Sequence, residues 1–135
     1  MSPKPGPHDG GAHPLVLAPS GAATVMTMSP GFYDELGRTF PDFRGHVLIQ
    51  RHGFDAPWPT WERHPEGDEY VYLLSGDADF VLWRDGREEI VRIDRPGSYV
   101  VAPRNTWHTA RPHAPTVMLF VTPGEGTQNA PSPQD

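Results

Sequence analysis

The sequence of 135 residues contains no cysteine. Disulfide bonds, thiolate metal sites and cysteine nucleophiles are therefore excluded. It also lacks an apolar run long enough to span a membrane. Its N-terminus has one lysine and no sustained apolar segment of the kind that a secretory signal needs. We therefore expect a soluble protein of the cytoplasm, without a membrane partner.

Positive charge is also scarce. Lysine and arginine total 11 against 17 acidic residues, which gives a net charge of −6 at pH 7. Binding to phosphate groups requires a basic surface, and the sequence has no long run of lysine or arginine. Nucleic acid is therefore not expected as the main partner.

Proline and glycine, in contrast, are abundant, with 17 and 14 residues. This content argues against a helical bundle and favours many short strands joined by tight turns. The length suits one domain with a single core. By composition, residues 1–14 are expected to form a disordered leader and residues 124–135 a flexible tail, with a β-barrel domain at 15–123 between them.

One short helix is expected near the N-terminus. Ser29 is a suitable cap, Pro30 a suitable first helical residue, and Gly37 a suitable end. The apolar residues Phe32 and Leu36 would cover one end of a barrel. A lid over a ligand is the functional alternative for the same segment.

The clearest strand pair surrounds Asp85–Gly86, a strong two-residue hairpin signal. This turn sets a register between residues 78–84 and 87–93 in which Asp79 faces Arg92, a favourable charge pair. The apolar pairs of the same register are Phe80 with Val91 and Ala78 with Ile93. With about eight or nine short strands in all, a double-sheet jelly roll or a small barrel are the main options.

Several carboxylate and imidazole side chains that could bind a metal lie between residues 61 and 76. Glu62 and His64 are two residues apart, so in an extended segment both side chains point the same way. A turn at residues 65–67 follows, and Glu69 enters the next strand. If Glu69 faces inward, two carboxylates and one imidazole converge on one interior, as a metal site requires.

A second informative stretch runs from Gly97 to His108. It has glycine, then five residues, then Pro103, then histidine five positions further on. Together with the first stretch it resembles the paired motifs of the cupin superfamily. The resemblance covers roughly residues 45–122.

Some positions match the family pattern and others depart from it. His64, Glu69 and Gly76 fall on the second histidine, the glutamate and the glycine of the first cupin motif. Glu62 stands where that motif has its first histidine, which keeps a donor atom but changes the charge and hardness of the site. In the second motif Asn105 replaces a glycine, and asparagine tolerates positive φ better than most residues.

The resemblance implies an all-β, double-stranded β-helix (a jelly-roll or cupin barrel) that binds a divalent transition metal. The implied ligands are His64, Glu69 and His108, with Glu62 as the fourth. The metal would be Fe, Mn, Ni, Co or Zn, and a second carboxylate shifts the preference toward Mn(II) or Fe(II). Off the metal, Glu62 could instead be catalytic, as a general base. If the site is empty, Glu62 would pair with an arginine, the candidates being Arg63, Arg104 and Arg111.

Cupins include dioxygenases, isomerases, decarboxylases and lyases, so the resemblance implies a metal-dependent enzyme acting on a small organic molecule. The alternative is a non-catalytic module that binds or senses a small molecule or a metal. The resemblance also implies a homodimer, and the outward-facing residues Tyr70, Tyr72 and Leu74 supply an apolar strip for it.

Several further side chains near the motifs have two possible roles, one structural and one in the interior of the barrel. His46 and His52 could line the interior or lie in solvent, and a structural or surface role is favoured for both. Five aromatic residues could frame an apolar substrate pocket, although packing is the commoner role of each: Trp58, Tyr70, Tyr72, Tyr99 and Trp107.

Overall fold

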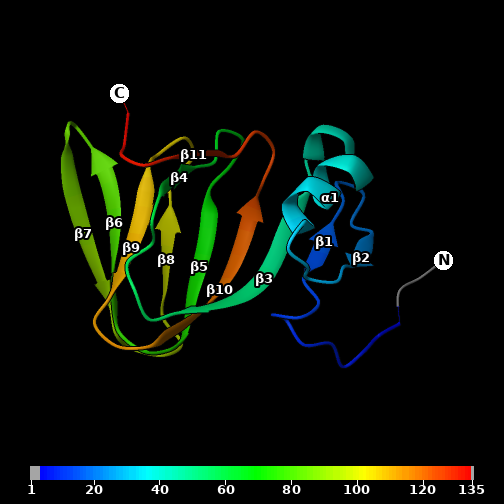
Figure 1. Ribbon diagram of the computed structural model, residues 1–135, viewed down its shortest axis with the longest axis horizontal. Coiled ribbons are helices and arrows are strands. Elements are labelled where there is room, and N and C mark those ends of the chain that lie inside the picture. The colour runs from blue at the N-terminus through cyan, green and yellow to red at the C-terminus, as the bar shows by residue number, and fades with distance from the viewer. Residues whose placement is uncertain (1–3, 135) are drawn as a thin grey trace.

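The computed structural model describes residues 4–134, which form two antiparallel β-sheets and one α-helix (Figure 1). The expected all-β jelly roll with a short helix near the N-terminus is confirmed. The first sheet has the order β2 (Ala23–Val25), β1 (Leu15–Leu17), β3 (Val47–Phe54), β10 (Thr116–Pro123), β5 (Glu69–Ser75) and β8 (Tyr99–Ala102). The second has the order β11 (Gln128–Ala130), β4 (Trp61–Arg63), β9 (His108–Pro112), β6 (Ala78–Arg84) and β7 (Arg87–Ile93).

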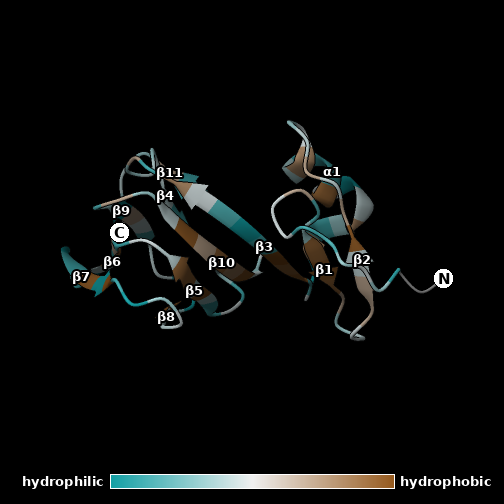
Figure 2. Cartoon of the chain, turned by 90° about the horizontal axis from the view of Figure 1, so that it is seen from below, coloured by the Kyte–Doolittle hydropathy of each residue, from teal (hydrophilic) through white to brown (hydrophobic). Residues whose placement is uncertain are grey.

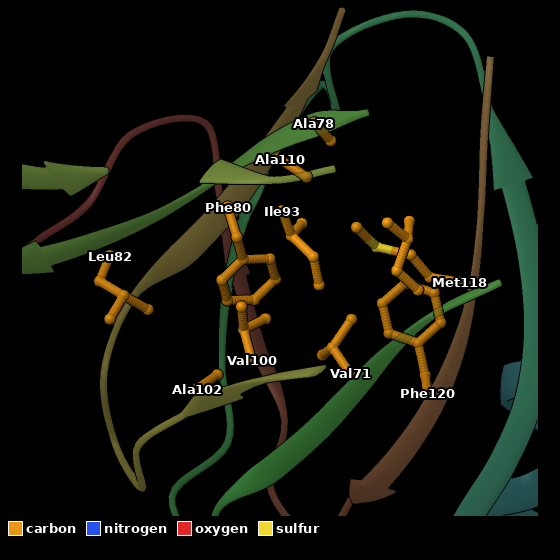
Figure 3. Packing of buried hydrophobic residues seen from close by; sticks show 11 residues of the cluster. Val71, Ala78, Phe80, Leu82, Ile93, Val100, Ala102, Ala110, Met118 and Phe120 are labelled. Carbon is orange, nitrogen blue, oxygen red and sulfur yellow. The ribbon is translucent and has the colours of Figure 1, made fainter. Parts of the chain in front are cut away.

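The main core lies between the two sheets (Figure 3). Every second side chain is buried along β10 and along β5 as far as Leu73, because successive residues of a strand point to opposite faces. Val71 of β5, Phe120 of β10 and Phe80 of β6 all belong to this apolar cluster. At one end of the same inner face, Glu69 and Thr122 take the place of apolar residues. The core therefore gives way to a polar region at that end.

The hairpin of β6 and β7 has the expected register, with Asp79 opposite Arg92. Both turn residues, Asp85 and Gly86, have positive φ, as a two-residue hairpin turn of this kind requires. The expected charge pair is not the one formed, however. Arg92 binds Asp77 at 2.7 Å, whereas Asp79 contacts His113 at 3.0 Å. A long guanidinium reaches a diagonal neighbour as well as the residue directly opposite.

The helix α1 (Phe32–Thr39) begins later than the sequence indicated. Gly31 is its N-cap and Gly37 lies inside it, so neither Ser29 nor Gly37 acts as a boundary. A 3₁₀ turn, η1 (Pro41–Phe43), follows directly. No helix in the described part of the chain has the length and apolar character needed to cross a membrane.

The helix packs against the outer end of the first sheet. Phe32 and Leu36 are buried with Val16 of β1 and Leu48 of β3. Figure 2 shows β3 changing from apolar to polar along its length, in keeping with its sequence of Val-Leu-Ile followed by Gln-Arg-His. The apolar part holds the helix. The polar part, with Gln50, borders the cavity described below.

Contacts extend beyond residues 15–123 at both ends of the chain. Asp9 forms an ion pair with Arg51 at 2.9 Å. The strand β11, which the sequence did not indicate, pairs with β4. The domain boundaries remain a prediction, and residues 1–3 of the expected leader and 135 of the expected tail lie outside the described residues.

Candidate metal centre

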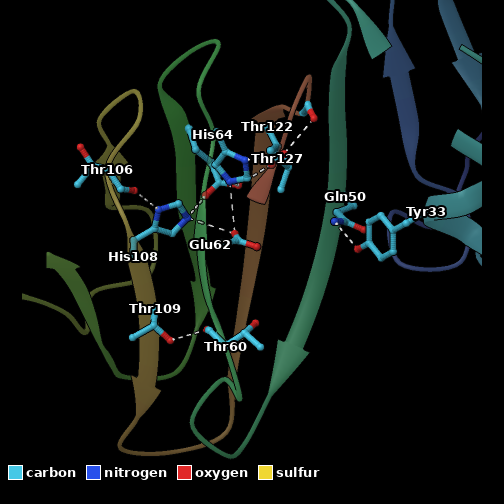
Figure 4. Close-up of polar contacts among 12 residues, drawn as sticks. Tyr33, Gln50, Thr60, Glu62, His64, Thr106, His108, Thr109, Thr122 and Thr127 are labelled. Atoms are coloured by element: carbon cyan, nitrogen blue, oxygen red, sulfur yellow. Dashed lines mark hydrogen bonds and ion pairs between the residues drawn. The ribbon is translucent and has the colours of Figure 1, made fainter. Parts of the chain in front are cut away.

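Three strands bring four potential metal ligands together inside the barrel (Figure 4). Glu62 lies in β4 directly opposite His108, the first residue of β9. His64 follows β4, and Glu69 is the first residue of β5. One donor atom from each residue lies within 4.8 Å of the others. The structure thus places together all four residues that the sequence singled out.

The donor atoms face one another at short range. His108 Nε2 is 3.2 Å from Glu62 Oε1 and 3.1 Å from Glu69 Oε1. His64 Nε2 is 3.4 Å from one oxygen of each carboxylate. His64, Glu69 and His108 are buried, whereas the side chain of Glu62 is 26% exposed. Glu62 is therefore the member of the group that solvent and ligands can reach.

The alternative in which Glu62 pairs with an arginine is not what the structure has. Its contacts are to the two histidines. The three candidate arginines have other partners, Gln128 for Arg63, Glu66 for Arg104 and Glu88 for Arg111.

At all four groups, burial and the neighbouring charges shift the pKa in opposite directions. Burial raises the pKa of Glu62, but His108 and His64 outweigh it and lower this pKa to about 2. Burial likewise opposes ionisation of Glu69, and the same imidazoles bring its pKa below the usual value. Burial lowers the pKa of both histidines, but the two carboxylates raise it to about 9 for His64 and about 10 for His108. Without metal, the site therefore holds two imidazolium and two carboxylate groups at neutral pH.

Contacts from outside the group orient the two imidazoles. His108 Nδ1 lies 3.0 Å from the carbonyl oxygen of Thr106, which can only accept, so Nδ1 donates. His64 Nδ1 lies 2.9 Å from the hydroxyl of Thr127, and that hydroxyl donates its own proton to the carbonyl of Gly124. His64 Nδ1 must therefore donate as well. In both rings Nε2 is the nitrogen that faces the centre and can carry the lone pair.

Glu69 is held in the same manner. The hydroxyl of Thr122 donates to Glu69 Oε2 at 2.5 Å, which leaves Oε1 directed at the centre. Two buried atoms of the group, His64 Nε2 and Glu69 Oε1, have no hydrogen-bond partner. Buried polar atoms are rarely left without a hydrogen bond, and here both have only the facing imidazoles and carboxylates of the group as ion-pair neighbours. The residues present therefore fit a divalent cation.

Glu62 differs from the other three residues. No hydrogen bond from outside the group holds it in the described part of the chain, since its contacts are to His64 and His108. A carboxylate held only by the residues around a metal can coordinate that metal or swing away from it. Both roles expected for Glu62 are therefore compatible with its surroundings.

Two backbone features support the site. Asn105 has a φ of 58°, and its amide donates to the carbonyl of His64, which ties the two motif stretches together. The positive φ that the sequence suggested for Asn105 is confirmed. Gly76 has a φ of 104°, and a Cβ there would lie 2.5 Å from the carbonyl oxygen of Pro115. This position at the end of β5 therefore accepts only glycine.

A cavity of about 790 Å³ adjoins the centre. Glu62, His64 and Glu69 lie in its wall, and it extends past β10 and β3 to the helix α1. Its remaining lining residues include Tyr33, Leu36, Asp42, Phe43, Leu48, Gln50, His52, Trp58, Thr60, Phe120, Thr122, Thr127 and Asn129. The helix therefore forms one wall of the cavity as well as covering the barrel.

The other side chains considered from the sequence lie in three places: the cavity wall, the outer face of the first sheet and, for Trp107, a buried cluster with Trp61 and Val81. Trp58 and His52 line the cavity. The tyrosines at 70, 72 and 99 instead form a stacked group on the outer face of the first sheet. Trp107 packs beneath the guanidinium of Arg63, 4.5 Å from its ring centre.

Sequence reasoning missed the threonines that orient the ligands. Thr122 is 53 residues from Glu69, and Thr127 is 63 residues from His64. Neither belongs to the motif stretches, and Thr127 lies in the segment expected to be a flexible tail. One signal was available for Thr122: it is a polar residue at a buried position of an otherwise apolar strand.

Comparisons with known proteins agree with this geometry. A family model described as a cupin domain matches residues 45–122, and none of the curated proteins matches the sequence. Among solved structures, a cupin superfamily protein from Desulfitobacterium hafniense is 19% identical over 56% of this chain and 65% of its own, with a TM-score of 0.47. An oxalate oxidase is 18% identical over 60% and 44%, with a TM-score of 0.50. Oxalate decarboxylase from Bacillus subtilis is 17% identical over 62% and 23%, also with a TM-score of 0.50.

The aligned part is thus less than two thirds of each of these three proteins. At their low identities, the likeness to oxalate oxidase and oxalate decarboxylase concerns the fold alone. The family model, in contrast, covers more than half of this chain and includes Glu62, His64, Glu69 and His108. The chain belongs to the cupin superfamily.

Proposed function

We propose that this cupin is a metal-dependent enzyme that acts on a small organic molecule. The observation that carries the proposal is the convergence of four donor atoms within 4.8 Å of one another. Two of them, His64 Nε2 and Glu69 Oε1, are buried without a hydrogen bond and have only the facing charged groups as ion-pair neighbours. These four residues would hold a divalent transition metal. Such an ion, when bound, would polarise a substrate oxygen as a Lewis acid.

The chain's own contribution is to position the ligands and to move a proton. Thr122, Thr127 and the carbonyl of Thr106 fix three ligands, so the centre is organised before a substrate enters. Glu62 faces the cavity and is the only partly exposed carboxylate of the group. In this position it can accept a proton from a bound substrate and return it later, provided that it leaves the metal.

The donor set favours hard cations. Two carboxylates and two imidazoles suit Mn(II) or Fe(II) better than a set of imidazoles alone. The oxalate decarboxylase of Bacillus subtilis contains Mn(II) centres, which makes manganese a reasonable first candidate. Nickel, cobalt and zinc are also compatible with these ligands.

Elemental analysis of protein purified without chelator tests the proposal. We expect about one equivalent of a divalent transition metal, which is the occupancy of a single site of this kind. His64→Ala and His108→Ala should each remove most of it. His46→Ala should not, because His46 is outside the group of four and its ring contacts the carbonyl oxygen of Arg44. A folded wild-type protein that takes up no metal would refute the proposal. Stoichiometric metal and ligand binding without turnover would favour the non-catalytic binding module instead.

A further inference from the structure

In the described part of the chain, no lysine or arginine lines the cavity beside the candidate metal centre. Its two histidines are His52 and His64, and His64 is paired with Glu62 and Glu69. Three of the described lining residues are acidic (Asp42, Glu62 and Glu69). The carboxylates of Glu62 and Glu69 would balance a divalent ion, and Asp42 adds a further negative charge to the lining. An anionic ligand would enter without a counter-charge, and burying an unpaired charge is costly. The lining therefore disfavours anions, above all a small dianion such as oxalate.

The wall also offers one unused hydrogen-bond donor. Three buried side-chain atoms in the described chain have no hydrogen-bond partner, and all three belong to residues that line this cavity. Two are the ligand atoms of His64 and Glu69, and the third is Nε1 of Trp58. An indole N–H can only donate. Nε1 itself is buried, so an acceptor oxygen on a molecule in the cavity reaches it only when the indole ring turns toward the cavity.

The surface around this donor is aromatic. The ring of Trp58 lies 5.8 Å from that of Phe120 and 5.5 Å from that of Phe54, measured between ring centres. Trp58 and Phe120 both line the cavity. Such a wall binds an apolar body, and aromatic rings in particular.

The wall formed by β3 and α1 is polar but uncharged. Gln50 of β3 donates through Nε2 to the hydroxyl of Tyr33 of α1 at 3.2 Å (Figure 4). Both residues line the cavity. With a volume of about 790 Å³, the cavity falls within the range that accommodates small organic ligands.

We infer that the cavity takes an uncharged molecule with an apolar body, which packs against Trp58 and Phe120 and accepts a hydrogen bond from Trp58 Nε1. This inference rests on the proposed function, because it names the class of substrate for that site. It also separates this chain from enzymes of oxalate, although their fold is shared.

A pair of probes of equal shape and different charge tests the preference. Benzamide is neutral and carries an acceptor oxygen, whereas benzoate is its anionic counterpart. In protein loaded with zinc, we expect benzamide to bind at least about tenfold more tightly than benzoate in a titration followed by NMR. Equal affinities, tighter binding of benzoate, or no saturable binding of benzamide would overturn the inference.

Two variants locate the effect within the cavity. Gln50→Lys places a cation in the wall and should reverse the preference toward benzoate, whereas the uncharged control Gln50→Met should not. Trp58→Phe keeps an aromatic ring but removes the donor, so benzamide should bind several-fold more weakly while toluene, which has no acceptor, binds unchanged. If Gln50→Lys left the preference unaltered, or Trp58→Phe weakened both probes alike, the inference would fail.

The same titration in metal-free protein separates this inference from the proposed function. Elemental analysis reports whether zinc has been incorporated, which decides the metal site alone. The cavity lining beyond the centre is the same in both forms, so benzamide should be preferred in both. A protein that takes up no zinc but prefers benzamide would contradict the proposed function and support the cavity preference. A protein that takes up zinc but does not prefer benzamide would support the metal site of the proposed function and contradict the cavity preference.

Discussion

Glu62 and His108 face each other directly across strands β4 and β9, with Glu62 Oε1 3.2 Å from His108 Nε2. This pair joins the two motif stretches at the metal centre. Glu62 stands at the position of the first histidine of the cupin motif, and among the described residues none outside the group of four orients it. Its role therefore decides whether the centre has four protein ligands or three ligands and a base.

Substitution of Glu62 distinguishes these roles. We favour Glu62 as a ligand, in which case Glu62→Gln should weaken metal binding by more than about 100-fold, beyond the effect of residues that only orient a ligand. If Glu62 is a base, Glu62→Gln should spare the metal and impair turnover. Glu62→His should keep a site under either role and change which metal is preferred. The measurement is a metal titration of the wild type and both variants in parallel.

Identical affinities and identical metal preferences in all three proteins would show that Glu62 does not coordinate the metal. If the wild type and both variants all failed to bind, there would be no metal site. The role of Glu62 would then be limited to its ion pairs with His64 and His108.

Thr127 offers a test of the contacts that orient the centre. Its hydroxyl accepts a hydrogen bond from Nδ1 of His64 and donates one to the carbonyl oxygen of Gly124. Thr127→Val removes both bonds at nearly constant volume, so we expect metal affinity to fall by about 10- to 100-fold. Thr127→Ser retains the hydroxyl and should bind like the wild type. Thr127 is exposed, so folding should be preserved in both variants, and equal affinities would show that His64 needs no such support.

Local spacing placed Glu62 and His64 on one strand face, whereas the resemblance to the cupin motifs added Glu69 and His108 to the predicted group. Glu62 and His64 share one strand face by parity, and the Asp85–Gly86 turn alone set the register of β6 and β7. Both depend on interactions within a few residues, where backbone geometry is restrictive.

The surroundings of the centre depend on contacts between distant segments and could not be predicted in this way. Thr127 meets His64 only because β11 pairs with β4, and no local pattern in a segment rich in glycine and proline indicated that strand. For the same reason Trp58 could not be told apart from Tyr99. Both are aromatic residues near a motif, yet Trp58 lines the cavity and Tyr99 lies on the outer face.

The outer face of β5 and β8 supports the prediction of a homodimer. Tyr99, Val101 and Leu74 are 57%, 44% and 42% exposed, and the rings of Tyr70 and Tyr99 lie 4.7 Å apart. An apolar face of this kind favours a second copy of the chain. We therefore expect a dimer in light scattering at high micromolar concentration, and Tyr99→Lys should shift it toward the monomer.

Ile90 provides the matched control for this experiment. It is 55% exposed but lies on β7, in the other sheet. Ile90→Lys should leave the dimer intact. A wild-type protein that is monomeric, or an equal effect of the two lysine substitutions, would argue against association through the β5–β8 face.

The proton balance of the centre gives a prediction about pH. In the metal-free protein the two carboxylates raise the pKa of His64 to about 9 and that of His108 to about 10, so both imidazoles are protonated at pH 7. A metal binds only the neutral ring, so binding at pH 7 should release about two protons, and affinity should rise with pH until about 10, the higher of the two pKa values. Calorimetry in two buffers with different ionisation enthalpies counts the protons.

The same pKa values set the stability of the metal-free protein. Because the folded pKa of each histidine lies above its usual value of 6.5, the ion pairs stabilise the fold fully below pH 6.5 and are lost as the pH rises through 9 to 10. Metal-free protein should therefore unfold at a lower temperature at pH 10 than at pH 6.5, and bound metal should reduce this loss.

For the proton count, His64→Gln should release about one proton fewer on binding metal than the wild type does. Release of less than one proton by the wild type at pH 7 would show that the histidines are already neutral and would contradict the prediction.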